Sequence, residues 1–441
     1  MSEAKTSERM SPGLQRVMER ARRNPHERQV ALAYLIDVEA LRRSYHRLRN
    51  QAAVGVDGVT KAAYGRDLEA NLQDLHMRLK TMTYRHQPIR RVHIPKDKNR
   101  TRPIGISATE DKIVQDALRE ILEAIYEQDF MDCSYGFRPG RRAHDALRAL
   151  HRAVRGGGAN VILEADIVSY FDSIDRPTLK GMLQERIADK SFMRLVAKCL
   201  HAGVLDGDVF SRPEEGTVQG SILSPILGNV YLHHALDQWF EGEVKPRLKG
   251  KATLIRYADD LVVTFEHRDD AERVMAVLGK RLGRFKLSLH PDKTRLIDFR
   301  RPPWSQAGGK GPGTFDFLGF TVYWRRNRQG RGWHVSWRTR KARLRRAMMT
   351  AYELCRRQRH MPVPVQHEAL RRRIQGHFNY FGVNDNQRSL ATLRHHVRRS
   401  WYKWLNRRSQ RSRLNWKRFK DLLRDFPLPS PQVYVDLWDD P

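Results

Sequence analysis

The stretch that decides the fold covers residues 253–265 and reads Thr253-Leu254-Ile255-Arg256-Tyr257-Ala258-Asp259-Asp260-Leu261-Val262-Val263-Thr264-Phe265. Apolar, strand-forming residues lie on both sides of an acidic pair, so we expect two short strands that meet at Tyr257–Asp260. An Asp-Asp pair is most often a solvated turn. The apolar flanks argue against that interpretation here, because adjacent carboxylates close to a core repel each other unless a cation joins them.

A second acidic strand lies upstream. Residues 161–167 read Val161-Ile162-Leu163-Glu164-Ala165-Asp166-Ile167 and place Asp166 near the end of a predicted strand. Carboxylate oxygens are the ligands that Mg²⁺ prefers. Two such ions about 3.5–4 Å apart can activate a hydroxyl and stabilise the leaving oxygen in phosphoryl transfer. Asp166, Asp259 and Asp260 are therefore candidate catalytic and metal-binding residues.

The composition indicates a polyanionic partner. The chain has 441 residues with 82 Lys+Arg and 50 Asp+Glu, which gives a formal net charge of +32. Nucleic acid is the first candidate for such a basic protein. From residue 321 onward, 29 Lys+Arg and 8 Asp+Glu leave a net +21 of that charge in the last third. No apolar run reaches the roughly 18 residues of a membrane helix, so we expect a soluble, cytoplasmic protein without a membrane partner.

Local patterns divide the chain near residues 320–335. The part before this boundary mixes α and β structure, and a Gly- and Pro-rich loop over 302–313 ends it. Its expected elements are helices over 30–49, 67–81 and 111–128 and strands over 91–94 and 102–106. The last third is predicted to be helical and rich in arginine. The three cysteines are far apart, which predicts free thiols and no zinc site.

Seven motifs, in order, resemble those of reverse transcriptases, and specifically of the proteins encoded by group II introns. The motifs are Arg102–Ile106, Ser134–Arg141, Asp166–Asp172, Gly216–Pro225, Tyr257–Asp260, Leu289–Thr294 and Phe317–Phe320. Each is weak alone, but together they are specific and cover residues from about 50 to 325. The ending at Pro441, without a Cys/His endonuclease module, is most similar to the class C subgroup.

The resemblance implies an α+β, right-hand polymerase. Fingers and palm would occupy residues 1–325, with an amino-terminal extension over about 25–85. An all-helical thumb, also called the X or maturase domain, would follow over 326–405. Residues 406–441 would form a short, basic, DNA-binding segment at the carboxyl end.

The resemblance also assigns roles around the acidic strands. Asp166 and Asp259 would be the main ligands of two Mg²⁺ ions, which Mn²⁺ can replace, with Asp260 as third carboxylate and Ile167 as a backbone ligand. Phe171 would exclude a ribose 2′-OH, the group that distinguishes RNA from DNA precursors. The alternative for Phe171 is core packing. Gln219, in a Gly-rich turn, would contact the incoming nucleotide or the template.

Basic residues complete the implied site. Lys96 and Arg102 would bind the triphosphate, although a merely solvated basic hairpin is the alternative. Lys293 would either protonate the leaving pyrophosphate or steady the site. In the last third, clustered arginine among aromatics suits phosphates and bases. The candidate nucleic-acid-binding residues there are Arg371, Arg372, Arg373, Arg407 and Arg408, whereas Phe378, Trp401 and Trp404 are expected mainly in a helical core.

These features favour an RNA-directed DNA polymerase that uses dNTPs, an RNA template and a DNA primer or target. The resemblance adds binding of the parent group II intron RNA, which assists splicing and retrohoming, in a bacterial cell with nucleoid association during insertion. Two alternatives remain open. One is a relative recruited to host defence or repair, and the other is a splicing cofactor with a vestigial polymerase site.

Overall fold

The Tyr257–Asp260 turn joins two strands of a central antiparallel sheet. The computed structural model describes residues 10–95, 101–156, 158–212, 215–217, 219–303, 313–327, 332–409 and 414–438. The sheet has the order β6-β7-β3-β8. Its strands are β6 (Ala252–Tyr257), β7 (Asp260–Phe265), β3 (Val161–Asp166) and β8 (Arg295–Asp298). The strands predicted over 161–167 and 253–265 are therefore confirmed to within one residue.

The alternation of side chains along β3 gives the sheet two different faces. Leu163 and Ala165 pack into the larger of two cores, whereas Ile162 belongs to the second core. Asp166 follows Ile162 at an even spacing and therefore shares its face. Asp260 of β7 lies directly opposite Asp166 in the antiparallel ladder. The register of two apolar strands thus brings two carboxylates together at one edge of the second core.

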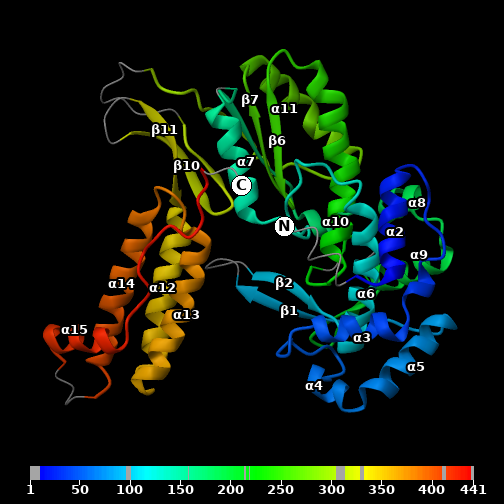
Figure 1. The fold of residues 1–441 in the computed structure, drawn as a ribbon, viewed down its shortest axis with the longest axis horizontal. Coiled ribbons are helices and arrows are strands. Elements are labelled where there is room, and N and C mark those ends of the chain that lie inside the picture. The colour runs from blue at the N-terminus through cyan, green and yellow to red at the C-terminus, as the bar shows by residue number, and fades with distance from the viewer. Residues whose placement is uncertain are drawn as a thin grey trace.

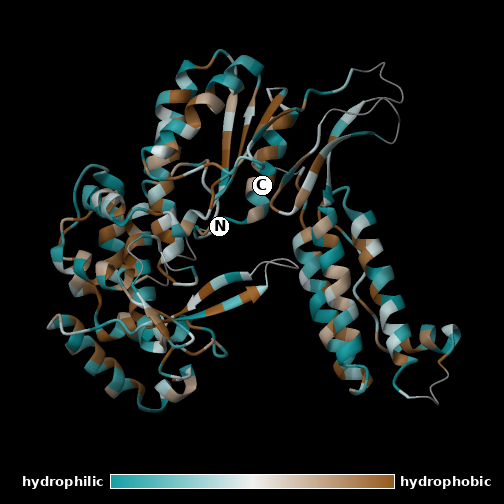
Figure 2. Cartoon of the chain, turned by 180° about the vertical axis from the view of Figure 1, so that it is seen from behind, coloured by the Kyte–Doolittle hydropathy of each residue, from teal (hydrophilic) through white to brown (hydrophobic). Residues whose placement is uncertain are grey.

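Helices cover both faces of the sheet (Figure 1). Their bounds are α6 (Thr109–Tyr126), α7 (Ala143–Arg155), α8 (Arg176–Arg186), α9 (Lys190–Leu200), α10 (Ser224–Leu232) and α11 (Arg268–Gly283). Helix α7 lies against the second core and the other five pack into the larger one. Hydrophobic residues dominate the strands of this sheet in Figure 2. The chain enters β6 through the π-helices η4 (His233–Asp237) and η5 (Phe240–Val244) and the 3-10 turn η6 (Lys245–Arg247).

A second sheet has the order β2-β1-β4-β5 and lies next to the amino-terminal helices. Its strands are β1 (Ile89–Pro95), β2 (Thr101–Ile106), β4 (Val204–Asp206) and β5 (Val209–Ser211). The expected antiparallel pairing of β1 with β2 is confirmed. The helices α2 (Pro12–Arg23), α3 (Val38–Arg47), α4 (Lys61–Tyr64) and α5 (Leu68–Lys80) surround α6, with the short turns η1 (Ala33–Leu35) and η2 (Gly65–Asp67) between them.

The helix expected over 30–49 is shorter in the structure. Ala31 has a left-handed φ of 55°, which a continuous helix does not allow. The helix begins only after Asp37, whose carboxylate accepts a hydrogen bond from the Ala40 amide at 2.7 Å. The other two predicted helices, over 67–81 and 111–128, match α5 and α6 closely.

The range 326–405 was expected to be all helical, and this expectation is wrong at its start. A third sheet, with the order β11-β10-β9, spans the boundary: β9 (Phe315–Phe317), β10 (Phe320–Arg326) and β11 (Trp333–Thr339). In β11, Val335 and Trp337 are buried, whereas Arg338 faces solvent. The arginine-rich composition of the last third hid this strand. The helices begin only at Lys341.

Beyond β11, the part of the chain that the structure describes contains three long helices and one short helix. They are α12 (Lys341–Arg357), α13 (Val363–Phe381), α14 (Gln387–Leu405) and α15 (Trp416–Asp425). In Figure 1, α12–α14 stand on the opposite side of the view from β1 and β2. Trp401 and Phe378 are fully buried, so the expected helical core is confirmed. No helix among the described residues has the length and apolar character that crossing a membrane requires.

Candidate active site

The acidic hairpin turn is unusually tight. Tyr257 pairs with Asp260, so only Ala258 and Asp259 form the loop. Ala258 has a left-handed φ of 56°, which two-residue hairpins require at such positions and for which glycine is the usual residue. A side chain in this conformation is strained and persists only when its surroundings hold it. Ala258 is buried, and two neighbouring parts of the chain supply that restraint.

The first restraint is the backbone of the Ser134–Arg141 motif. The Tyr135 amide donates to the Arg256 carbonyl at 2.8 Å, and the Arg256 amide donates to the Cys133 carbonyl at 2.8 Å. A Cβ atom added to Gly136 would lie 2.3 Å from the Ala258 nitrogen. Residue 136 must therefore be glycine for this segment to pack against the turn.

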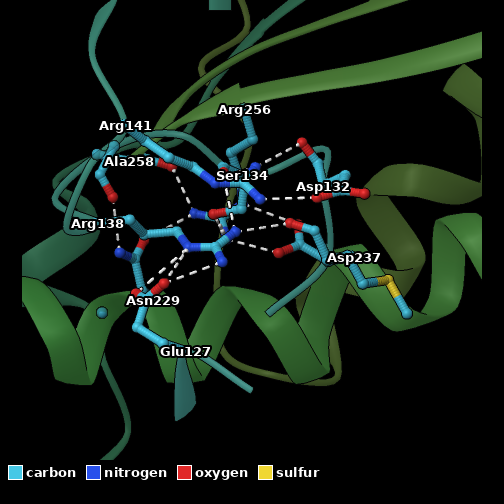
Figure 3. A network of polar contacts seen from close by, with 12 residues as sticks. Glu127, Asp132, Ser134, Arg138, Arg141, Asn229, Asp237, Arg256 and Ala258 are labelled. Atoms are coloured by element: carbon cyan, nitrogen blue, oxygen red, sulfur yellow. Dashed lines mark hydrogen bonds and ion pairs between the residues drawn. The ribbon is translucent and has the colours of Figure 1, made fainter. Parts of the chain in front are cut away.

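The second restraint is the side chain of Arg256, which is fully buried below the turn (Figure 3). Its Nε donates to Asp237 Oδ1 at 2.8 Å and its Nη2 to Asp237 Oδ2 at 2.5 Å. Its Nη1 donates to Asn229 Oδ1 at 3.0 Å and to the Ala258 carbonyl at 3.1 Å, and its Nη2 also reaches Ser134 Oγ at 2.7 Å. The guanidinium thus connects the loop to α10, to η4 and to the Ser134 segment.

The arginines of the Ser134–Arg141 motif have a structural role of the same kind. Arg138 donates to Glu127 of α6 at 3.0 Å and to the Ser134 carbonyl at 3.0 Å. Arg141 donates to Asp132 Oδ1 at 2.7 Å. Figure 3 shows both guanidinium groups directed into the loop that supports Arg256. This motif therefore builds the support of the acidic turn.

The three candidate carboxylates lie at neighbouring ends of β3 and β7, close enough to act on one another's pKa. Burial raises the pKa of Asp259, the charge of Asp166 adds to that shift, and Arg102 and Lys293 oppose it. Asp260 is open to solvent at its edge, yet desolvation by the surrounding protein, followed by Asp259 and Asp166, raises its pKa to about 6. The mutual repulsion that the sequence predicted is therefore present in the structure.

Lys293 lies at the same place. Its Nζ donates to Asp166 Oδ2 at 2.5 Å, so the ammonium group neutralises one of the carboxylates. The segment that carries it is fixed to β3 by hydrogen bonds from the Val168 amide to the Ser288 carbonyl and from the His290 amide to the Asp166 carbonyl. Ile167 faces Leu289 between these two hydrogen bonds, so its carbonyl takes part in neither of them.

The donor chemistry fits a hard divalent cation, but the side chains as they stand do not form a closed cage. Within the described ranges, no three His, Cys, Asp or Glu side chains are grouped closely enough to hold a metal ion. The Lys293 ammonium group is paired with Asp166, one of the carboxylates that a metal cation would bind. Carboxylates that raise one another's pKa repel each other when ionised, and a bound cation would relieve that repulsion. Binding would therefore require Lys293 to turn away from Asp166.

A cleft of about 420 Å³ lies where β1 and β2 of the second sheet face Asp172 and the Gly-rich segment that leads to Gln219. Gln219 and Asp172 line it together with Arg91 of β1. The Gly105 amide donates to the Gln219 carbonyl at 2.7 Å, which fixes the Gly-rich turn to β2. Gly220, with φ of 110°, allows this contact because a Cβ there would lie 2.5 Å from the Gly105 carbonyl oxygen.

Phe171 directly precedes Asp172 of the cleft lining and packs against the larger core. It lies in the 3-10 turn η3 (Tyr170–Asp172), which follows the left-handed Ser169, and its carbonyl accepts from the Thr217 amide at 2.7 Å. Its ring is half-buried and packs beside Tyr170 at 5.2 Å between centroids. One part of the ring thus packs inward and another part is accessible, and the two interpretations of Phe171, exclusion of a 2′-OH and core packing, both stay predictions.

Arg102 connects the cleft with the carboxylates electrostatically. Burial raises the pKa of Asp172, and the charges of Arg91 and Arg102 act against that shift. Arg102 also lowers the pKa of Asp259. The side chain at the start of β2 is thus within reach of both groups. Lys96, the other expected triphosphate partner, lies outside the described residues.

The structure adds residues that sequence reasoning missed. Arg256 and Asp237 hold the turn, Arg91 and Asp172 line the cleft, and the charge of Arg343 of α12 acts against the rise in the pKa of Asp260. A charged residue inside an otherwise apolar strand was the available signal for Arg256. Arg343 carried none, because its proximity depends on how α12 folds back.

The basic residues of the last third are not gathered into one site. Arg371 and Arg372 both pair with Glu368, at 2.7 and 2.5 Å. Arg407 lies over the ring of Trp404 at 5.7 Å, and Arg408 donates to the Met361 carbonyl at 3.0 Å. The position of Arg373 on α13 is exposed. The five candidates therefore lie along α13 and at the end of α14.

Comparison with known proteins agrees with this geometry. The reverse transcriptase (RNA-dependent DNA polymerase) family matches residues 94–322, which include the acidic hairpin and the cleft. Protein YkfC of Escherichia coli (strain K12) is 34% identical over 310 residues, which cover 63% of this chain and 77% of that protein. Group II intron-encoded protein LtrA of Lactococcus lactis subsp. cremoris is 38% identical over 201 residues, 45% of this chain and 33% of LtrA.

A plant relative extends the comparison. Nuclear intron maturase 2, mitochondrial, of Arabidopsis thaliana is 29% identical over 177 residues, which cover 31% of this chain and 24% of that protein. The chain thus spans most of YkfC but only about a third or less of the two intron proteins. The family match covers more than half of the chain, over the segments that build the hairpin and the cleft. The chain therefore belongs to the reverse transcriptase (RNA-dependent DNA polymerase) family, in its group II intron type.

Proposed function

We propose that this chain copies RNA into DNA at the Tyr257–Asp260 turn and that it also binds its parent group II intron RNA to assist splicing and retrohoming. One observation carries the polymerase half. Asp166 and Asp260 lie opposite each other on adjacent strands, and Asp259 is held beside them by a strained, restrained turn. A turn without catalytic use would not require that restraint.

The proposal includes a right-hand arrangement. The second sheet, with β1 and β2, corresponds to fingers, and the central sheet to the palm. Helices α12–α14 correspond to the thumb, which then begins at Lys341 and not at residue 326. The basic carboxyl-terminal segment over 406–441 corresponds to the DNA-binding part. Support comes from the position of α12–α14 across from β1 and β2, with the acidic turn between them in chain order.

In this proposal, Asp166, Asp259 and Asp260 hold two Mg²⁺ ions, with the Ile167 carbonyl as a further oxygen donor. Bound ions would increase the nucleophilicity of the primer 3′-hydroxyl and stabilise charge on the leaving pyrophosphate. Lys293 moves from Asp166 toward the phosphates as the carboxylates become neutralised. Its ammonium group then either donates a proton to pyrophosphate or stabilises its charge.

The cleft would receive the incoming nucleotide. Arg102, and with it Lys96, binds the triphosphate, because a guanidinium and an ammonium group are natural phosphate donors. Gln219 lies at the cleft wall and contacts the nucleotide or the template base. The accessible part of the Phe171 ring excludes a 2′-OH, which makes the product DNA.

RNA binding would depend on the basic helices. The last third carries a net charge of +21, from 29 Lys+Arg and 8 Asp+Glu. Along α13 and just after the end of α14 lie Arg371, Arg372, Arg373, Arg407 and Arg408. Such a surface suits backbone phosphates, and binding that depends on it weakens steeply with salt.

Primer extension tests the two halves separately. Wild-type protein should extend a DNA primer on an RNA template with dNTPs and Mg²⁺, and Asp259→Asn should abolish extension without weakening RNA binding. Asp208→Asn, an exposed residue in the β4–β5 turn, is the matched control and should extend normally. Loss of RNA affinity in Asp259→Asn would contradict the separation of the two functions.

A further inference from the structure

A second, larger cavity of about 1210 Å³ lies at the junction of four parts of the chain. These are the end of α7, the β10–β11 hairpin, the turn between α13 and α14, and the carboxyl-terminal segment around Val433 and Trp438. Figure 1 shows the carboxyl end of the described chain lying against α7 and β10. The volume exceeds the ~300–1,000 Å³ of most small-molecule sites.

This cavity is separate from the acidic turn. Ala159 and Asn160 line it just before β3 begins, whereas Asp166 is the last residue of that strand. With a rise of ~3.3 Å per residue, Asn160 and Asp166 are roughly 20 Å apart along the strand. A ligand in the cavity would therefore not contact the catalytic carboxylates, and the role of the cavity is not explained by nucleotide transfer.

Positive charge surrounds the cavity. Arg155, Arg301 and Arg388 come from three different segments and are all exposed. Across the described ranges none of these three guanidinium groups forms an ion pair. The acidic residue of the lining, Asp385, is already paired with His334 at 2.8 Å and with Arg325 at 3.5 Å. Among the described residues these guanidinium groups have no acidic partner, and such exposed positive charge suits an anionic ligand.

Aromatic rings form the other part of the wall. Trp324 is fixed because its indole N–H donates to the Phe299 carbonyl at 2.8 Å. Trp333 lies on the neighbouring strand β11, and Trp438 is 45% exposed with its ring 6.3 Å from that of His334. Partly exposed indoles next to free guanidinium groups suit a ligand with both a flat ring and a phosphate, which is the chemistry of a nucleotide.

The walls are preformed, because the carboxyl-terminal segment is fixed at several points. The Tyr434 amide donates to the Gly382 carbonyl at 2.7 Å, and the Leu437 amide donates to Asn384 Oδ1 at 2.8 Å. Arg148 of α7 donates to the Asp436 carbonyl at 3.1 Å. This acidic end of the chain thus connects α7 to the α13–α14 turn and holds Trp438 at the cavity.

We propose that this cavity binds one or more unpaired nucleotides of a single-stranded nucleic acid, with bases against Trp333 and Trp438 and phosphates on Arg155, Arg301 and Arg388. Unpaired bases can enter such a cavity, whereas bases stacked in a duplex cannot. The ample volume and the separate arginines suit a strand that enters and leaves the cavity better than a free mononucleotide. The proposal goes beyond template copying, because it concerns a second site.

Photocrosslinking of the full chain tests the location directly, without primer or dNTPs. The probe is a ten-nucleotide RNA of mixed sequence that carries 5-iodouridine, and its DNA counterpart carries 5-iododeoxyuridine. We expect crosslinks in the peptides that contain Trp333 or Trp438. A higher yield with RNA or with DNA identifies the source of the strand. Crosslinks confined to α12–α14 and to the cleft of Gln219 would overturn the proposal.

A charge test gives a second, independent result. Arg155→Gln combined with Arg388→Gln should reduce these crosslinks and should lower the slope of log affinity against log salt by about 1.4, the value for two phosphate contacts on a single strand. Arg16→Gln with Arg22→Gln removes the same charge from exposed positions on α2 and should leave both unchanged. Equal effects of the two double variants would contradict the proposal. So would displacement by AMP at concentrations equal to those of the oligonucleotide.

Discussion

Replacing Arg256 by methionine should separate the stability of the palm core from the geometry of the acidic turn. The guanidinium pairs with Asp237, which is itself fully buried. Methionine removes the charge but fills part of the same space. Asp237 is then left without a counter-charge, and the Ala258 carbonyl loses its donor. The first loss acts on stability and the second on the position of Asp259.

The expected magnitudes differ for the single and double variants. Breaking a buried ion pair by removing one partner destabilises by about 3–5 kcal/mol. Arg256→Met combined with Asp237→Leu removes both charges, so its stability should return to within about 1–3 kcal/mol of the wild type, the remainder reflecting lost hydrogen bonds. The extension rate should not return, because a misplacement of about 1 Å can slow a reaction roughly 100-fold.

Urea unfolding and single-turnover primer extension measure the two effects on the same samples. Arg268→Met is the matched control, because it breaks an exposed pair with Glu272 at 2.8 Å and should change stability by less than about 1 kcal/mol. The reasoning is refuted if the double variant regains both wild-type stability and wild-type rate. Arg256 would then act on the fold alone.

Three further predictions concern the same site. Gly136→Ala should destabilise by about 1–3 kcal/mol in urea unfolding, because its Cβ would lie 2.3 Å from the Ala258 nitrogen, whereas Gly181→Ala, with open space around it, should not. Phe171→Ala should raise the use of ribonucleotides relative to deoxyribonucleotides by at least about tenfold, equivalent to ~1.4 kcal/mol, in competition extension assays, and an unchanged ratio would assign the ring to core packing. The pKa of Asp260 is raised from 3.8 to about 6 in the folded protein, so the folded state holds the proton more tightly than the unfolded state. The stability that this carboxyl contributes is therefore fully present below pH 3.8 and is lost as the pH rises through about 6. In thermal melts with EDTA, Asp260→Asn should therefore be more stable than wild type at pH 7.5, and the difference in melting temperature should be smaller at pH 5. The same difference at both pH values would count against repulsion among the carboxylates.

The sequence predicted those strands and helices whose residue pattern alone indicates the element. The hairpin over 253–265 and the strand over 161–167 consist of apolar, strand-forming residues next to acidic ones, and α5 and α6 have a clear apolar stripe. The strand β11 was missed because it lies in the arginine-rich last third, whose composition made the whole segment look like a basic helix. The break at Ala31 was missed because a left-handed alanine has no sequence signature.

The candidate site was predicted in its carboxylates but not in its support. Asp166 and Asp259 could be found because acids on apolar strands are costly without a partner. Asp237 could not be found, because its contact with Arg256 depends on the π-helix η4, which ends at Asp237 and has no signature in the sequence. The cleft depends on β1, β2, η3 and the Gly216–Gln219 segment together, and Arg343 reaches Asp260 from a helix that begins after the third sheet.

The most direct test of the central claim is the rate of single-nucleotide extension of a DNA primer on an RNA template, measured over a range of Mg²⁺ concentrations. Our account predicts that wild-type protein adds the complementary deoxynucleotide only when Mg²⁺ is present, and that Asp166→Asn, Asp259→Asn and Asp260→Asn each reduce the rate by orders of magnitude. Extension that persists without a divalent cation, or that is unaffected by these three substitutions, would contradict it.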